Sequence, residues 1–467
     1  MKPLHEIFDQ PACEHNRAKG KKRNAGCPKP EPGSAMGGCA FDGAQITLLP
    51  IADVLHLVHG PSACLANSWE ARGSLSAGPE MTWRGFMTDL SEQEIIFGGE
   101  KKLEAAIHEA VRKFAPPAVF VYSTCVTALI GEDLEAVCAK ASRELDLPVV
   151  PVNSPGFIGS KNLGNRMAGE ALLEYVIGTR EPEVSTPYDV NLVGEYNIAG
   201  ELWQVKPLFE EAGIRILASI TGDGRFGDIR TAHRAKATMV VCGRALINLA
   251  QGLLDRYGIP YFEGSFYGIR ETGEALRNFG RILGGEVPER VEALIKREEA
   301  RLDHDLRPYR EILKGKKALL YTGGVKSWAF ISALQDLGME VVATSSRKST
   351  MDDVAKMKSL LGESGVIMEE GGPKVILKTM RERGAHILLA GGRNQYTAVK
   401  GRVPFIDVNQ ERHRPYAGYE GMRRLAQDLA LELTHPVYRQ IAEGDGRFGK
   451  GGMEAESAAE EWAICKV

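Results

Sequence analysis

Short runs of β-branched residues alternate with longer amphipathic segments between about residues 46 and 435, and this alternation constrains the fold more than any other feature. Many of the amphipathic segments end at Gly or Pro, which stop helices and mark turns. Parallel strands joined by crossover helices produce this pattern. The sequence therefore predicts an α/β fold made of doubly wound parallel sheets.

Four series of strands and helices follow the pattern, and each is expected to form one small sheet. The series comprise Ala118–Tyr122, Glu132–Leu145 and Val149–Val152; Val190–Gly194, Leu202–Ala212 and Ile214–Ile220; Thr238–Cys242 and Arg244–Tyr257; and Ala318–Thr322, Ser327–Leu337, Glu340–Ala343, Ile387–Ala390 and Phe405–Val408.

Charge and proline cluster at 178–187, and the segment 285–315 is rich in Glu, Arg and Lys, which predicts domain boundaries at both places. A chain of 467 residues is too long for one hydrophobic core. We expect three α/β domains, with a charged helical linker before the third. An extended arm precedes them and a loosely held tail follows, so the expected segments are 1–45, 46–185, 186–285, 286–315, 316–435 and 436–467.

The charge balance excludes one class of partner. Lys and Arg number 58 against 61 Asp and Glu, so the chain lacks the basic excess that nucleic-acid backbones require. No apolar run is long enough to span a bilayer and the N-terminus lacks a signal-peptide core. We therefore expect a cytoplasmic protein that binds neither nucleic acid nor membrane.

Three of the eight cysteines are candidate metal ligands because they lie in loops of small residues. Cys39 follows two glycines, Cys64 closes the segment 59–64, and Cys125 follows a predicted strand. Small neighbours let backbone N–H groups approach cluster sulfides. Each of these thiols taken singly could equally be an inert buried residue, but three of them in such loops favour a metal site. The spacing matches no zinc motif, and an iron-sulfur cluster needs four thiolates, so a partner chain could supply the fourth.

A fourth thiol, Cys242, also closes a predicted strand, before the helix that begins near Gly243. Ligands of doubly wound sheets bind at the carboxyl ends of strands, and a helix N-terminus stabilises thiolate. Cys138 lies on the apolar face of a predicted helix and is interpreted as a core residue. Cys13, Cys27 and Cys465 lie in the arm and tail, where no convergent ligands give them a role.

The segments around these cysteines resemble the nitrogenase component-one superfamily. The resemblance runs from about residue 30 to residue 435 and is carried by 32–44, 59–64, 122–133, 156–165, 241–246, 258–268 and 321–326. Within the superfamily the pattern is most similar to the cofactor-assembly scaffold. It implies three α/β domains, in agreement with the count above.

By this resemblance, Cys39, Cys64 and Cys125 hold a 4Fe-4S cluster shared with a partner subunit, and Cys242 binds a precursor of the iron-molybdenum cofactor. The precursor is an iron-sulfur cluster that later gains molybdenum and homocitrate. The implied assembly is a heterotetramer with an N-type partner subunit. The nitrogenase iron protein docks on it, and other proteins donate and accept the cofactor.

The resemblance also places residues around the precursor. Arg72, Lys326, Arg393 and His413 are the cationic candidates, which suit sulfides and carboxylates. Asn409 stands where the catalytic subunit has a histidine ligand, and an amide is a poor ligand for a transition metal. Attachment through Cys242 alone suits a cluster that must leave, so the chain is expected to be a scaffold rather than a catalyst.

Two other readings stay open. A nitrogenase catalytic α subunit, or the related subunit of the dark-operative protochlorophyllide reductase, shares the cluster-binding plan; an α/β binding module without metal would use every thiol for packing. The segment 323–327 lacks the full phosphate-loop spacing.

Overall fold

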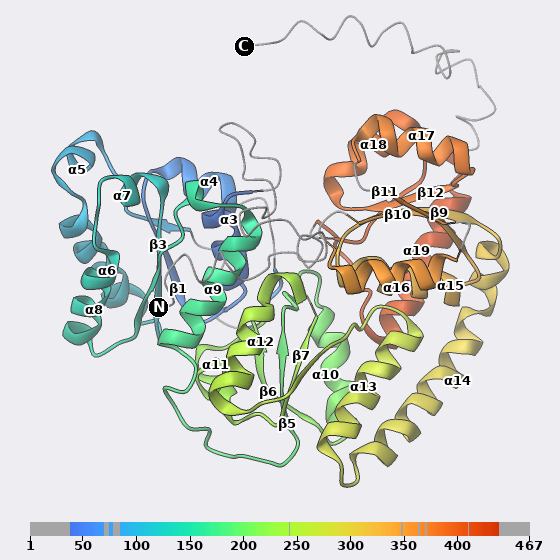
Figure 1. Ribbon diagram of the computed structural model, residues 1–467, viewed down its shortest axis with the longest axis horizontal. Coiled ribbons are helices and arrows are strands. Elements are labelled where there is room, and N and C mark those ends of the chain that lie inside the picture. The colour runs from blue at the N-terminus through green and yellow to red at the C-terminus, as the bar shows by residue number, and fades with distance from the viewer. Residues whose placement is uncertain are drawn as a thin grey trace, which may run out of the picture.

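The chain folds into three parallel β-sheets, and helices cover both faces of each sheet (Figure 1). The computed structural model describes residues 38–69, 74–77, 85–241, 243–346, 349–362, 365–368, 371–409 and 411–438. The arm up to residue 37, the tail after residue 438, Arg72 and Cys242 lie outside them. The predicted class, parallel α/β sheets, is confirmed.

The first sheet has the strand order β2-β1-β3-β4. Its strands are β1 (Leu55–His59), β2 (Phe86–Met87), β3 (Val119–Ser123) and β4 (Val149–Val152). Alternate residues of β3 face opposite sides. Val119 and Val121 pack with α6 (Glu100–Phe114) and α8 (Leu134–Leu145), while Phe120 and Tyr122 pack with α3 (Ala40–Leu48) and α9 (Lys161–Tyr175).

The second sheet has the order β6-β5-β7-β8. It contains β5 (Asp189–Val193), β6 (Arg215–Ile220), β7 (Ala237–Val240) and β8 (Tyr261–Glu263). Helices α10 (Glu201–Glu211) and α13 (Ile269–Leu283) cover one face, and α11 (Phe226–Thr231) and α12 (Gly243–Tyr257) cover the other. The second and third predicted series thus share one sheet, because β7 pairs directly with β5.

The third sheet has the order β11-β10-β9-β12-β13. Its strands are β9 (Lys317–Tyr321), β10 (Glu340–Ser345), β11 (Val366–Met368), β12 (Ile387–Ala390) and β13 (Phe405–Asp407). One core contains residues of α15 (Val325–Asp336), α16 (Met351–Leu361) and α19 (Gly418–Thr434). Helices α17 (Pro373–Arg383) and α18 (Gln395–Gly401) contribute to the core on the other face.

The cores are continuous between sheets. One cluster of buried side chains runs from the second sheet through α14 (Val287–Leu313) to the third sheet. Another joins α3 and the first sheet to α11 and α12 of the second. The segment 286–315, expected to be a charged helical linker, is mostly one helix, but this helix has a buried apolar face that includes Val291, Leu294 and Leu302.

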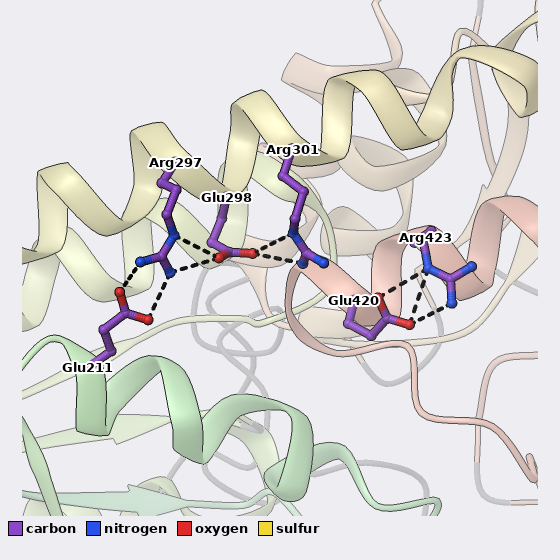
Figure 2. Close-up of polar contacts among 6 residues, drawn as sticks. All are labelled: Glu211, Arg297, Glu298, Arg301, Glu420 and Arg423. Carbon is purple, nitrogen blue, oxygen red and sulfur yellow. Dashed lines mark hydrogen bonds and ion pairs between the residues drawn. The ribbon is translucent and has the colours of Figure 1, made fainter.

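The exposed side of α14 carries ion pairs that reach the second sheet's helices (Figure 2). Arg297 lies between Glu211 at the end of α10 and Glu298, and Glu298 also accepts from Arg301 at 2.8 Å. Glu420 and Arg423 pair separately on α19. Apart from Glu298, which is 8% exposed, these side chains are partly exposed. Exposed pairs contribute only about 0–1 kcal/mol each, so the buried face of α14 dominates its attachment.

Helix α3 changes one predicted boundary. It begins at Ala40, and eight of its nine residues are buried, so residues 40–45 belong to the packed fold rather than to an extended arm. The amphipathic pattern is hidden there because the helix is buried almost all round. No helix among the described residues is long and apolar enough to cross a membrane.

Candidate functional site

Cys64 and Cys125 follow two neighbouring strands of the first sheet. Strands β1 and β3 are parallel, and their last residues, His59 and Ser123, are paired in register. Cys64 lies in α4 (Ser62–Trp69) after β1, and Cys125 begins α7 (Cys125–Leu129) after β3. The strand order reverses between β1 and β3, which is where doubly wound sheets bind ligands.

Cys39 reaches the same place because α3 packs very closely against α9. A Cβ atom on Gly43 would lie 1.9 Å from the carbonyl oxygen of Lys161, and one on Gly164 would lie 1.8 Å from the carbonyl oxygen of Ala40. Only glycine permits this approach of two backbones. Cys39 caps the N-terminus of α3, and its backbone forms an isolated bridge with Ser160 just before α9.

Gly156 shows how closely the thiols converge. A Cβ atom there would lie 3.0 Å from Sγ of Cys39 and 3.1 Å from Sγ of Cys125, so these sulfurs are separated by no more than the sum of the two distances. Cys64 interacts electrostatically with both thiols. The structure thus brings the three predicted ligands together from three different segments of the chain. The sulfurs of Cys39 and Cys125 lie beside Gly156, which has no side chain.

The three thiols suit a soft metal better than an inert core. Each is only partly buried, whereas Cys138 is fully buried among α6 and α8, as predicted. Burial raises the pKa of Cys39 and raises the pKa of Cys64 to about 11, and the neighbouring thiols add to both effects. Without metal the thiols of Cys39 and Cys64 hold their protons, and iron-sulfur ligation would displace them. The donor set fits three ligands of an iron-sulfur cluster.

Gly156→Ala is expected to lower the iron content of the anaerobically purified protein, because its methyl group would enter the space beside the sulfurs of Cys39 and Cys125. Overpacking of this kind costs roughly 1–3 kcal/mol. Iron analysis and visible absorption measure the effect. Gly372→Ala is the matched control, because a Cβ there would meet no atom within 4 Å. Equal iron in both variants would contradict the proposed position of the cluster.

A separate cavity of about 180 Å³ lies where the second and third sheets face α9. Its walls come from the carboxyl-end loops of β5, β7, β9 and β13, with α3 and α9 closing one side. The lining includes Ile46, Lys161, Asn162, Asn165, Glu195, Tyr196, Val241, Glu263, Gly323, Gly324, Lys326, Asp353, Asn409 and Arg412.

The cavity contains some of the residues expected to hold a precursor. Lys326 and Asn409 line it. Val241 also lines it and directly precedes Cys242 in the sequence, while Cys242 itself and Arg72 lie outside the described residues. The lining does not include Arg393 or His413, and both are exposed.

Arg412 is a buried cation of the cavity. The sequence suggests its neighbour His413 instead. The guanidinium of Arg412 is 1% exposed and lies 2.5 Å from the carboxylate of Glu201, itself fully buried. It donates to the hydroxyl of Tyr267 at 3.1 Å and to the carbonyl oxygen of Asn409. Charged residues surround Arg412 in the sequence, and no local signal distinguishes the one that turns inward.

Arg412 joins two sheets at the cavity. Glu201 begins α10 of the second sheet, whereas Asn409 follows β13 of the third. Tyr267 is fixed by an isolated bridge to Ala417 and stacks on Phe330 with ring centroids 5.0 Å apart. The cation of Lys326 lies 5.5 Å from the centre of the Tyr267 ring. The cavity wall is therefore held by buried charge and aromatic contacts.

Comparison with known proteins agrees with this architecture. Residues 39–434 match the family model described as nitrogenase component 1 type oxidoreductase. The chain is 57% identical over 441 residues to the nitrogenase iron-molybdenum cofactor biosynthesis protein NifE of Rippkaea orientalis, covering 94% of each chain. It is 52% identical to the protein of that name from Klebsiella pneumoniae, over 93% of this chain and 96% of the relative.

A solved structure extends the agreement to the fold. The structure titled "Nitrogenase Cp1 at pH 6.5" superposes with a TM-score of 0.79 at 27% identity, covering 87% of this chain and 90% of that one. The family match spans most of the chain, including the three convergent cysteines and the cavity-lining residues described above. The chain belongs to the family of nitrogenase component 1 type oxidoreductases.

Proposed function

We propose that this chain is a scaffold subunit on which the nitrogenase iron-molybdenum cofactor is assembled. Near-full-length similarity to proteins named for iron-molybdenum cofactor biosynthesis carries the proposal. Two separate sites support it: three convergent thiols at the first sheet, and a cavity between the second and third sheets. One site serves a resident cluster, and the other holds the cofactor precursor, which is cargo.

The resident group is a 4Fe-4S cluster held by Cys39, Cys64 and Cys125. Three thiolates leave one ligand to be supplied from outside this chain, so the cluster lies at the interface with a NifN-like subunit in a heterotetramer. The cluster supplies electron transfer when it is bound. The chain's part is to supply ligands from three rigid segments and, at Gly156, a backbone that leaves room beside the sulfurs.

Exposed apolar side chains next to the thiols support a partner surface there. Leu129, on the same short helix as Cys125, is 73% exposed, and Phe157, next to Gly156, is 56% exposed. Such side chains mark interfaces when they gather in one region. The partner subunit covers part of this region, and the nitrogenase iron protein docks beside it.

The cargo is an iron-sulfur precursor that gains molybdenum and homocitrate before it is passed from a donor to an acceptor protein. Cys242 would ligate it. Two cations of the cavity, Lys326 and Arg412, both lie within 6 Å of the centre of the Tyr267 ring. Asn409 offers an amide in the cavity, and amides bind transition metals weakly. A cargo held by one thiolate can leave, which favours a scaffold over a nitrogenase catalytic α subunit.

Cys242→Ala is expected to abolish retention of the cargo while leaving the interface cluster in place, because the two sites are built on different sheets. The test is iron content and electron paramagnetic resonance of the complex purified anaerobically with its partner. The variant should lose the cargo's iron and keep the cluster's signal. Loss of both signals together would contradict separate sites, and loss of neither would contradict the role of Cys242.

A further inference from the structure

Glu195 is a buried carboxylate in the wall of the cavity. It lies two residues after β5, lines the cavity and is 5% exposed. Arg412 contacts the Glu201 carboxylate directly at 2.5 Å and reaches Glu195 only through Tyr267, whose hydroxyl lies 3.5 Å from Oε2 of Glu195. The buried carboxylates of Glu195 and Glu201 thus share one guanidinium, and only Glu201 has a direct ion pair with it among the described contacts.

The charged groups that act most strongly on Glu195 come from different elements. Glu201 belongs to α10, Arg412 to the turn before α19, and Lys326 to α15, while Tyr267 contributes its hydroxyl. Burial raises the pKa of Glu195, the Glu201 carboxylate raises it further, and Arg412 and Lys326 oppose these effects without cancelling them. Glu195 therefore titrates closer to neutral pH than an exposed glutamate does.

The cavity is poorly matched to an anionic cargo while Glu195 is ionised. Its charged lining consists of Lys161, Lys326 and Arg412 against Glu195, Glu263 and Asp353. Sulfides and carboxylates entering this space add negative charge and attract the Lys326 ammonium group. A buried carboxylate that loses part of its cationic surroundings and gains an anionic neighbour becomes easier to protonate.

We propose that Glu195 determines which charge of cargo the cavity accepts, by taking up a proton from solvent when an anionic cargo binds and releasing it when the cargo leaves. Oε1 accepts a hydrogen bond from the backbone N–H of Asn197 at 3.0 Å. The proton is therefore placed on Oε2, where the Tyr267 hydroxyl can change from donor to acceptor. This inference rests on the proposed function, since it requires an anionic cargo in the cavity.

The sign of the coupling follows from linkage. When the loaded state binds one more proton than the empty state, retention is unchanged at pH values where Glu195 is protonated in both states. Retention weakens as the pH rises from the pKa of Glu195 in the empty cavity to its higher pKa in the loaded cavity. Thiolate ligation by Cys242 has the opposite dependence, because it releases a proton. A variant that removes only the carboxyl group separates the two effects.

The test compares the wild-type complex with Glu195→Gln, both purified anaerobically with the partner and loaded with iron-sulfur precursor. The amide keeps an oxygen for the Asn197 N–H, so the local backbone is retained. Cargo is measured as the iron in excess of a Cys242→Ala complex, during dialysis at pH values from mildly acidic to mildly alkaline. The ratio of wild-type to variant release rates should rise with pH, by up to about tenfold per pH unit.

Two further variants make the result decisive. Asp53→Asn changes another partly buried carboxyl whose pKa is raised by burial, but outside the cavity, and should behave as wild type. Glu195→Asp keeps a titratable group and should retain the pH dependence even if Glu195→Gln folds poorly. A release ratio that does not change with pH, or an Asp variant without pH dependence, overturns the inference. Absence of excess iron at every pH overturns the proposed function instead.

Discussion

A complex carrying Cys125→Ala is expected to lose nearly all of the iron at the partner interface while the chain remains folded. Cys125 lies close to Cys39, since both sulfurs would be within 3.1 Å of a Cβ atom on Gly156, and it also interacts with Cys64. Its removal leaves two ligands on this chain, too few to hold a cluster with one ligand from a partner. Iron analysis and electron paramagnetic resonance of the anaerobic complex measure the loss.

Cys138→Ala provides the matched control for this prediction. Cys138 is fully buried between α6 and α8, and burial raises the pKa of its thiol to about 12, so it packs as a small apolar group. Its replacement should cost on the order of 1 kcal/mol in stability and leave the iron content unchanged. Iron retained at wild-type level in Cys125→Ala would end the case for a cluster at these thiols.

Arg412→Ala is expected to lower the free energy of unfolding by about 3–5 kcal/mol, the cost of leaving a buried carboxylate without its partner. Glu201 would keep its hydrogen bond from the backbone N–H of Ala199 but lose the guanidinium. The carbonyl oxygen of Asn409 and the hydroxyl of Tyr267 would each lose a donor as well. Chemical denaturation of the variant measures the change.

Arg423→Ala tests whether this loss is specific to buried charge. Arg423 also pairs with a glutamate, Glu420, at 2.6 Å, but both side chains are about one-third exposed (Figure 2). Its removal should change stability by less than about 1 kcal/mol. Arg412→Lys should fall between the two, because an ammonium cannot satisfy three acceptors in the plane of a guanidinium. Similar losses for Arg412→Ala and Arg423→Ala would contradict the importance of burial at the cavity.

Much of the fold could be predicted because strands buried on both faces leave a clear record in sequence. Predicted strands such as Ala118–Tyr122 and Val149–Val152 lie within one residue of β3 and β4. The pairing of strands could not be predicted from local patterns, since these do not show that β7 lies beside β5. Helix α3 was missed because a helix buried on nearly all sides lacks a polar face.

The candidate site shows the same division. Cys39, Cys64 and Cys125 could be chosen from their small neighbours, and Lys326 and Asn409 from resemblance to the superfamily. The importance of Gly156 and Arg412 depends on contacts between segments far apart in the chain. A glycine shows no sign in sequence of which side chains approach it, and Arg412 differs from its charged neighbours only in the direction it faces.

The hydrophobic cores shared between neighbouring sheets make separate unfolding of one sheet unfavourable. Side chains of the second and third sheets meet in one apolar cluster through α14, and those of the first and second meet in another. A single lobe cut from the chain, or exchanged with that of a distant relative, would expose a large apolar surface. The three sheets are therefore expected to unfold together as one cooperative unit rather than one after another.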